Sequence, residues 1–313
     1  MTSPASGRTA RIWRDGTLIA WEDAHIHVMS HVVHYGSSVF EGVRVYETPM
    51  GPAIFRARDH MRRLHDSARI YRMAMRWSVD ELVQAAADTV SINRLPACYL
   101  RPVVVRTGEE MGVLGTAAPI ETFIIAWKWG AYLGQSALEH GVDVCVSSWR
   151  RPAPDTVPTM AKAGGHYLNS QLTKMEARLD GFAEGIMLDV AGQISEGSGE
   201  NLFLIRDGVL YTAPLASGIL NGVTRDSVMQ IARDLGLDVR ERTLPREMLY
   251  VADEVFFCGT AAELTPIRSV DHIQVGEGRP GPITRAIQEE YLGIAQGRRP
   301  DRHGWLTVIP DRV

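Results

Sequence analysis

The segment PTMAKAGGHYLNSQLTKMEARL places Lys162 between small residues and just before Gly164 and Gly165. Glycine has no Cβ atom, so the backbone there can approach a bulky planar ligand or adopt a positive φ. A lysine at such a corner can be desolvated and directed inward, which lowers its pKa and makes its amine nucleophilic. The alternative interpretation is a solvated lysine in a glycine turn, because most lysines are exposed.

A second candidate is the segment QISEGSGENLF, in which Glu196 and Glu200 flank Gly197 and Gly199 before an apolar run. A carboxylate positioned by a glycine-rich corner can hold the protonated ring nitrogen of a heteroaromatic cofactor. An ordinary acidic hairpin loop has the same composition. The segment by itself leaves both interpretations open.

Two further turns and one arginine are candidates for an anion site. In ILNGVTRDSV, Val223 and Thr224 follow a glycine at the start of an expected helix. Backbone N–H groups and a hydroxyl at a helix N-terminus suit a phosphate, whereas plain N-capping by Thr224 is the alternative. FFCGTAAEL ends a strand in a turn around Thr260, which either offers more N–H donors or is merely a turn. Arg63 either supplies the fixed charge that a phosphate needs or is one solvated arginine among many.

These side chains need regular elements to position them. RIWRDGTLIAW predicts two short strands around an Asp-Gly hairpin turn. Apolar residues at helical spacing predict a helix from near Asp59. Ser78 and Glu81 form a capping box that opens a second helix, which ends near Asn93.

Periodicity also assigns faces within two of the predicted elements. In the strand ACYLRPVVVR the period of two places Tyr99, Arg101 and Val103 on one face. The helix after Lys162 is predicted to be amphipathic and to stop at Gly181. Its apolar residues at helical spacing are Leu168, Leu172, Met175 and Leu179.

The length of 313 residues predicts two domains rather than one. The small, turn-like residues of AYLGQSA indicate a linker at 131–137. We therefore expect a smaller N-terminal domain at 1–130 and a larger domain at 138–313. Strands and helices follow one another without regular βαβ units, which indicates an α+β fold.

Composition excludes several classes of function. The formal net charge of −4 gives no basic footprint, so no nucleic-acid partner is expected. No apolar run is long enough for a bilayer and no secretory signal is visible, so no membrane association is expected. Three distant cysteines in apolar runs indicate reduced, buried thiols and a cytoplasmic protein. The histidines show no paired metal spacing, so we expect no metal and structural roles for His25, His27, His31 and His34.

Eight motifs in the right order, from about Ile12 to Trp305, resemble the branched-chain amino-acid aminotransferases of fold type IV, also called class IV aminotransferases. They are HYGSSVFEGVR, FRARDHMRRLHDSA, CYLRP, WGAYLG, PTMAKAGGHYLNS, GQISEGSGENLF, GVTRDSV and CGTAAELTP. The resemblance implies a two-domain pyridoxal 5′-phosphate enzyme, with a smaller N-terminal α/β domain and a larger C-terminal domain that has a β-barrel-like core. It implies amino-group transfer from leucine, isoleucine or valine to 2-oxoglutarate.

The resemblance also implies roles for individual residues. Lys162 would bind the cofactor covalently and move the proton at the substrate α-carbon, Glu196 would pair with the ring nitrogen, and Tyr167 would bond the phenolic oxygen. The phosphate would be held by Arg63, Val223, Thr224 and Thr260. Tyr99 with the backbone of Thr260 and Ala261 would hold the α-carboxylate, and Arg101 would meet the distal carboxylate of glutamate. The walls of the apolar pocket would be Tyr35, Phe40, Trp129, Tyr132 and Tyr167.

The same resemblance implies an assembly of several copies. Met111 and Val113 would reach the pocket of the neighbouring subunit, so a homo-oligomer of at least two copies is expected, with a hexamer as the larger alternative. Relatives on this fold act on D-amino acids or (R)-amines, and such an activity is the alternative function. A non-catalytic or nucleotide-binding module is disfavoured, because the glycine-rich turns lack the spacing of dinucleotide and phosphate-binding loops.

Overall fold

The computed structural model describes residues 7–109, 112–130 and 133–310 of the chain. By packing, the chain divides into two compact units. The first comprises Met1–Trp129, Ala161–Gly165 and Gly293–Val313, and the second comprises Gly130–Met160 and His166–Leu292. The expected division at 131–137 differs from this packing at two places, since 161–165 and 293–313 pack with the N-terminal residues. As a boundary between folding domains it stays a prediction.

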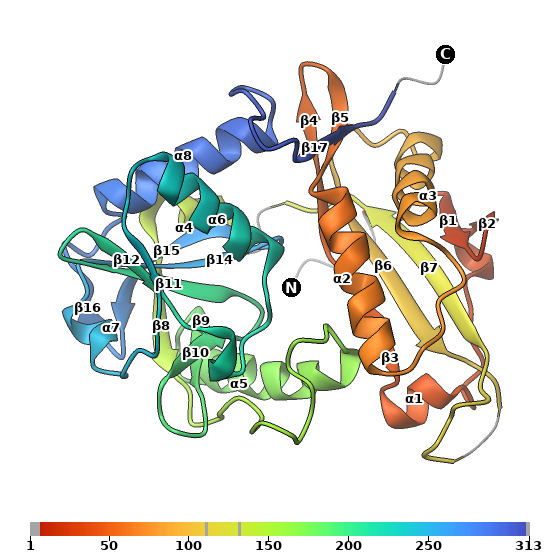
Figure 1. Ribbon diagram of the computed structural model, residues 1–313, viewed down its shortest axis with the longest axis horizontal. Helices are drawn as coiled ribbons and strands as arrows, with labels where there is room; N and C mark the ends of the chain where they lie inside the picture. Colours follow the sequence, from red (N-terminus) through yellow and green to blue (C-terminus); the bar gives the residue numbers. More distant parts are fainter. Residues whose placement is uncertain (1–6, 110–111, 131–132, 311–313) are drawn as a thin grey trace. The chain divides into compact units, whose positions relative to one another are not determined.

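The first unit is built on an antiparallel sheet with the order β17-β5-β4-β6-β7-β1-β2, and β3 pairs with β6 (Figure 1). Its central strands are β6 (Cys98–Arg106) and β7 (Ile120–Trp127). The other strands are β1 (Arg11–Arg14), β2 (Thr17–Ala20), β3 (Ser38–Phe40), β4 (Val43–Thr48), β5 (Gly51–Phe55) and β17 (Leu306–Val308). The predicted hairpin of RIWRDGTLIAW is confirmed as β1 and β2, and the predicted strand of ACYLRPVVVR is confirmed as β6. The short strand β3 and the helix α1 (His31–Tyr35) were not predicted.

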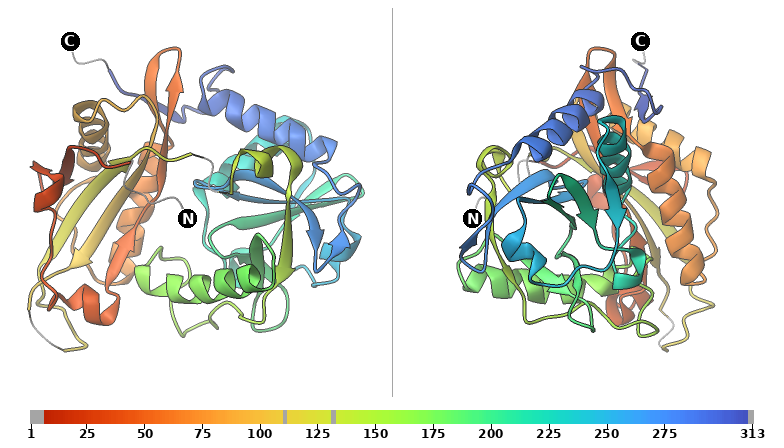
Figure 2. Two further views of the ribbon diagram at one scale, coloured as in Figure 1. Left: turned by 180° about the vertical axis from the view of Figure 1, so that it is seen from behind. Right: turned by 60° about the vertical axis from the view of Figure 1, so that its left-hand side comes forward.

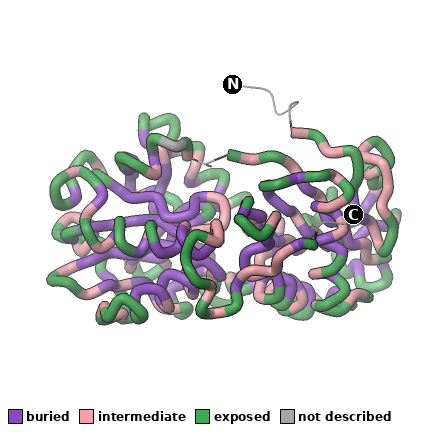
Figure 3. Tube along the Cα trace, turned by 90° about the horizontal axis from the view of Figure 1, so that it is seen from above, coloured by how far each residue is buried: buried purple, intermediate pink, exposed green. Residues whose placement is uncertain are grey.

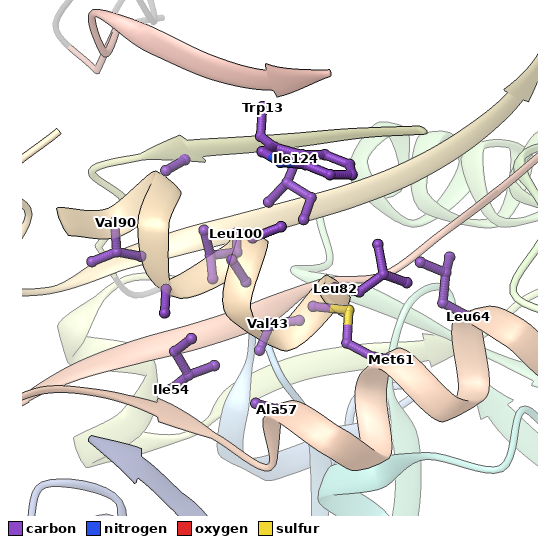
Figure 4. Close-up of a cluster of buried hydrophobic side chains, with 14 of the residues drawn as sticks. Trp13, Val43, Ile54, Ala57, Met61, Leu64, Leu82, Val90, Leu100 and Ile124 are labelled. Atoms are coloured by element: carbon purple, nitrogen blue, oxygen red, sulfur yellow. The ribbon is translucent and has the colours of Figure 1, made fainter. Parts of the chain in front are cut away.

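Two helices, α2 (Ala57–Ile70) and α3 (Val79–Ile92), share one apolar core with this sheet. Figure 4 shows Met61 and Leu64 of α2 and Leu82 of α3 in the same cluster as Leu100 and Ile124 of the sheet. The predicted capping box is present, because the Ser78 side chain accepts from the Glu81 N–H and the Glu81 side chain accepts from the Ser78 N–H. The opposite face of β6 and β7 lies away from this core.

The second unit contains a mixed sheet in the order β10-β9-β8-β15-β14-β11-β12-β13, with β16 paired to β15. It curls as a half-barrel (Figure 2), in line with the expected barrel-like core. Its strands are β8 (Val142–Val146), β9 (Glu184–Leu188), β10 (Ile194–Gly197), β11 (Asn201–Arg206), β12 (Val209–Thr212), β13 (Val239–Glu241), β14 (Glu254–Gly259), β15 (Glu263–Val270) and β16 (Ile273–Gln274). The helices are α4 (Gln135–His140), α5 (Tyr167–Leu179), α6 (Val223–Asp234), α7 (Met248–Val251) and α8 (Pro282–Ala295), whose last residues belong to the first unit. The α+β class is confirmed.

Buried residues gather in the interior of each unit (Figure 3), above all in the strands β9, β10, β11 and β14, whereas the strands β2, β13, β16 and β17 contain none. Helix α5 is the exception to the sequence-based assignment of faces. Its buried residues are Ser170, Thr173 and Ala177, whereas Leu168 and Leu179 are 66% and 86% exposed. The expected apolar face is therefore mostly in solvent, because small side chains, not the leucines, pack against β9.

The three cysteines are free and buried, as predicted. Burial raises the pKa of Cys98 to about 12, so its thiol stays protonated at neutral pH. In the part of the chain that the structure describes, no helix combines the length and the apolar composition that a membrane span needs. The same residues contain no cluster of three or more His, Cys, Asp or Glu side chains suited to a metal ion.

Candidate active site

Lys162 belongs to the first unit, where its backbone is fixed on both sides. Its N–H donates to Ser67 Oγ of α2 at 3.0 Å, and its carbonyl accepts from the Phe40 N–H at 3.0 Å. The ammonium nitrogen lies 5.2 Å from the centre of the Phe40 ring. Lys162 is half-buried. A freely solvated lysine in a turn does not fit this arrangement.

Of the two glycines after Lys162, Gly164 serves close packing, and neither serves a left-handed backbone. Neither Gly164 nor Gly165 is among the residues with positive φ. A Cβ atom on Gly164 would lie 2.3 Å from Ser38 Oγ, a distance that real Cβ atoms do not reach. The lysine segment therefore sits directly on strand β3, where Val39 also bridges to Ala163.

The sheet face opposite the helices carries an arginine among aromatic rings. Arg101 Cζ lies 4.6 Å from the ring centre of Phe40, 5.8 Å from that of Tyr99 and 5.8 Å from that of Trp127. The Trp129 ring packs edge-on against Tyr99 at 4.5 Å. Tyr99 and Arg101 share this face, as predicted, while Leu100 and Val104 enter the helix-covered core. Arg101 Nε is buried and has no hydrogen-bond partner within the described part of the chain.

A buried acidic residue that sequence reasoning missed lies beneath Arg63. Glu41 accepts from Arg63 Nε at 2.7 Å and from Arg63 Nη2 at 2.8 Å, and His60 Nδ1 lies 2.8 Å from Glu41 Oε2. Burial alone would raise the pKa of Glu41, but the charge and hydrogen bonds of Arg63, helped by His60, hold that pKa far below its usual range. Burial lowers the pKa of His60, so a neutral ring donates to an ionised carboxylate. The sequence does contain one signal for Glu41, because it is a single acidic residue inside the apolar stretch SVFEGV.

Glu196 lies on β10 of the second unit, in a site rich in donors. Its Oε2 accepts from Asn201 Nδ2 at 2.9 Å and from the Leu220 N–H at 3.0 Å. Its Oε1 lies 3.1 Å from Arg151 Nη2, and both side chains are less than a tenth exposed. These donors, from three segments, stabilise the charged form of the carboxylate and fix its orientation. Arg151 and Asn201 were not predicted, because nothing in their local sequence marks them as its partners.

Glu200 lies four residues further on but has different surroundings. It is 4% exposed, and its Oε2 accepts from the Gly199 N–H at 3.0 Å. The nearby carboxylate of Glu184 is paired with Lys174 at 2.5 Å. Burial, with the charge of Glu184 adding to it, raises the pKa of Glu200 to about 8. Glu200 is thus a mostly protonated carboxyl group at neutral pH.

The helix start at Val223 also belongs to the second unit. The N-cap is Gly222, which supplies no side-chain hydrogen bond, so Thr224 is inside the helix and is not its cap. Thr224 is 3% exposed. Thr260 and Ala261 lie in the turn between β14 and β15, and Tyr167 is the first residue of α5.

Two more of the predicted site residues, Tyr35 and Val113, belong to the first unit. Tyr35 ends α1 and is 41% exposed, and Val113 is 82% exposed. Met111 and Tyr132 lie outside the described residues. The first unit thus gathers Lys162, Phe40, Tyr99 and Arg101 on one sheet face, and the second unit gathers Glu196 with the turn that precedes α6.

Comparison with known proteins identifies the family. Residues 38–270 match the family model described as "Amino-transferase class IV". This match spans most of the chain and includes both the lysine segment and the Glu196 corner. The chain belongs to the class IV aminotransferases.

Individual relatives narrow this assignment. The branched-chain-amino-acid aminotransferase of Escherichia coli (strain K12) is 55% identical over 299 residues, which cover 95% of this chain and 97% of that protein. A crystal structure of the Escherichia coli branched-chain amino acid aminotransferase superposes with a TM-score of 0.93 at 53% identity, covering 97% and 100% of the two chains. The branched-chain amino acid aminotransferase from Thermobaculum terrenum, in its PLP-form, gives a TM-score of 0.90 at 36% identity, covering 96% and 99%. Within the class IV enzymes, the chain belongs to the branched-chain-amino-acid aminotransferase family.

Proposed function

We propose that this protein transfers the amino group of leucine, isoleucine or valine to 2-oxoglutarate, giving branched 2-oxo acids and L-glutamate. The observation that carries the proposal is Arg101, a cation surrounded by the rings of Phe40, Tyr99 and Trp127. The rings suit a branched apolar side chain, and the guanidinium suits the distal carboxylate of glutamate. The relatives described above carry the branched-chain name, and none of them favours D-amino acids or (R)-amines.

The cofactor of this reaction is pyridoxal 5′-phosphate, in keeping with the PLP-form of the Thermobaculum terrenum relative. Three features of this chain fit it: the amine of Lys162, whose backbone N–H is held by Ser67, the carboxylate of Glu196, which is paired with Arg151, and the helix start at Val223. When bound, the cofactor supplies an electron sink for the substrate α-carbon.

The protein's own groups then divide the work. Lys162 would hold the cofactor through Nζ, and its amine would carry the proton from the substrate α-carbon to carbon C4′ of the cofactor. Glu196 keeps the ring nitrogen protonated, since Arg151, Asn201 and Leu220 stabilise its negative charge. Tyr167 donates to the phenolic oxygen. The expected phosphate ligands are Arg63, Val223, Thr224 and Thr260.

Substrate binding is assigned to the remaining predicted residues. Tyr99 and the backbone of Thr260 and Ala261 hold the α-carboxylate. The apolar side-chain pocket is lined by Tyr35, Phe40, Trp129, Tyr132 and Tyr167. The neighbouring subunit contributes Met111 and Val113 to it. On this assignment the smallest active form is a homodimer, and a hexamer is the larger alternative. We also propose that the enzyme works in the cytoplasm and folds as two domains joined at 131–137.

An absorbance spectrum of the purified protein tests the proposed function. A band in the near-visible region that shifts on addition of L-leucine, but not of D-leucine, is the expected result. A protein that stays colourless after supply of pyridoxal 5′-phosphate contradicts the cofactor assignment. A spectrum that responds only to D-leucine or an (R)-amine contradicts the substrate assignment.

The first prediction is that Lys162→Ala abolishes turnover, because no other amine replaces the proton acceptor at the α-carbon. Borohydride reduction followed by peptide mapping should label Lys162. Lys174 is the internal control, since its amine is bound to the Ala183 carbonyl at 2.9 Å and to Glu184 at 2.5 Å. A label on Lys174 or Lys128 would overturn the assignment.

A further inference from the structure

The loop between β6 and β7 carries two adjacent apolar residues, Val113 and Leu114, which we call its tip. These side chains are 82% and 80% exposed. Single exposed apolar residues are common on protein surfaces. Two adjacent ones at a loop tip call for an explanation when buried polar side chains hold the loop on both sides.

Arg106, the last residue of β6, is the first of these buried side chains. It is 5% exposed, and its Nη1 donates to the Gly115 carbonyl at 2.9 Å. Its Nη2 donates to the carbonyls of Tyr71 and Arg72, each at 3.0 Å. The guanidinium thus joins the loop to the residues that follow α2.

His31, the first residue of α1, holds the other side of the tip. It is 3% exposed, with Nε2 3.0 Å from the Gly112 carbonyl and Nδ1 2.7 Å from Ser37 Oγ. A carbonyl can only accept, so Nε2 carries the proton, and in the neutral ring Nδ1 accepts from the Ser37 hydroxyl. A Cβ atom on Gly115, whose φ is +52°, would lie 2.3 Å from His31 Nε2. Only glycine therefore fits the loop against this ring.

The same imidazole contacts a predicted pocket residue. Its ring centre lies 4.6 Å from that of Tyr35, at an interplanar angle of 43°. His31 therefore touches Tyr35 with its ring and holds the base of the Val113 tip through Nε2. A displacement of the ring would move both groups together.

We propose that His31, assisted by Arg106, is a positioning residue that fixes Tyr35 and the Val113–Leu114 tip relative to each other and so sets the enzyme's preference for branched apolar side chains. This inference rests on the proposed function, which assigns Tyr35 to the side-chain pocket and Val113 to the pocket of the neighbouring subunit. The ring of His31 bonds Gly112 and Ser37 and packs on Tyr35, and none of these belongs to the lysine segment or to the α-carboxylate site. Its loss should therefore affect recognition of the side chain rather than the proton transfer.

The test compares His31→Phe with His31→Gln. Phenylalanine keeps a ring against Tyr35 but has no donor for the Gly112 carbonyl, whereas glutamine can place an N–H near the position of Nε2. We expect His31→Phe to raise the KM for L-leucine about tenfold with kcat changed by less than about threefold, the scale of one lost hydrogen bond. The KM for L-glutamate should change less, because Arg101 binds its distal carboxylate. His31→Gln should restore most of the leucine affinity.

The matched control is His34→Phe, on the same helix. His34 also makes one ring-nitrogen contact to a carbonyl, that of Val28 at 3.0 Å, but at an exposed position. It should leave both KM values unchanged. If His31→Phe does not retain the cofactor band, His31→Asn replaces it, since asparagine can keep the contact to Ser37 while it loses both the donor to the Gly112 carbonyl and the ring against Tyr35.

Two outcomes would overturn the positioning role in an active enzyme. One is an equal loss with leucine and glutamate in His31→Phe, which indicates general damage. The other is the absence of any rescue by His31→Gln. A wild-type protein with no activity on leucine would instead overturn the proposed function, and the substrate role of the tip with it.

Discussion

The carboxylate of Glu196 in the second unit and the guanidinium of Arg101 in the first unit both have polar atoms removed from water. Glu196 has three donors, one of them a buried arginine. Arg101 has three aromatic rings around its guanidinium and a buried Nε without a hydrogen bond in the described chain. A polar group that the protein satisfies fully acts as a permanent fixed charge. One that the protein leaves partly unsatisfied is suited to a ligand that completes it.

Replacing Glu196, the carboxylate with all its donors in place, should slow the reaction with leucine more than replacing Arg101 does. Glu196→Gln leaves the buried Arg151 with the Gly218 carbonyl but without a charged partner, and it removes the charge that would keep the cofactor ring nitrogen protonated. We expect the rate of the half-reaction with leucine to fall about a hundredfold, near 3 kcal/mol, the upper end for a hydrogen bond to a charged group. Single-turnover absorbance kinetics measures this rate.

Glu200→Gln is the matched control for that experiment, because it makes the same chemical change four residues away. Glu200 accepts from one backbone N–H and is mostly protonated at neutral pH, so its amide should lower the rate by less than about tenfold. Comparable losses at both positions would show that the two carboxyl groups do not differ in the way their surroundings indicate.

Removing the guanidinium of Arg101 should slow mainly the reaction with glutamate. Arg101→Ala should slow the half-reaction with glutamate by about 1.5–3 kcal/mol, the scale of a charged hydrogen bond, and the half-reaction with leucine much less. Arg14→Ala is the control, since Arg14 also lies over a ring, Phe123 at 5.3 Å, but has Glu121 as a partner at 2.6 Å. It should spare both half-reactions. Equal losses with leucine and glutamate in Arg101→Ala would indicate a structural arginine.

Much of the fold could be predicted because its signals are local. The Asp-Gly turn between β1 and β2 and the Ser78–Glu81 capping box depend on residues a few positions apart. The shared face of Tyr99 and Arg101 follows from the period of two along one strand. Helix α5 shows the limit of this reasoning. Periodicity assigns its leucines to one buried face, but only tertiary packing decides that small side chains face β9 instead.

The candidate site shows the same contrast between local signals, which the sequence reveals, and tertiary partners, which it does not. Lys162 and Glu196 stand in distinctive glycine-rich segments, and the resemblance to a known family assigned their roles. Glu41 was missed because it acts through a partner, Arg63, which is 22 positions away. The donors of Glu196 were missed for the same reason, since Leu220, which completes the set, is 24 positions away. Such partners are set by the register of strands and by loop geometry, which no local pattern contains.

The last prediction concerns Glu200 and the pH dependence of stability. Burial and the neighbouring charge of Glu184 raise the pKa of Glu200 to about 8, whereas an unfolded glutamate has a pKa of about 4.3. Between these two values the folded protein holds a proton that the unfolded chain has released. Stability contributed at this position therefore falls as pH rises through the window, by up to about 1.4 kcal/mol per pH unit.

Glu200→Gln removes this proton, so its free energy of unfolding should fall less between pH 5 and 8 than that of the wild type. Urea unfolding of both proteins across this range measures the difference, with Glu121→Gln as a control at a half-exposed ion pair. Parallel curves for the wild type and Glu200→Gln would show that Glu200 is ionised when folded. A wild type whose stability falls more steeply than that of the variant would confirm that Glu200 keeps its proton in the folded protein, where its carboxyl group is buried and accepts from the Gly199 N–H.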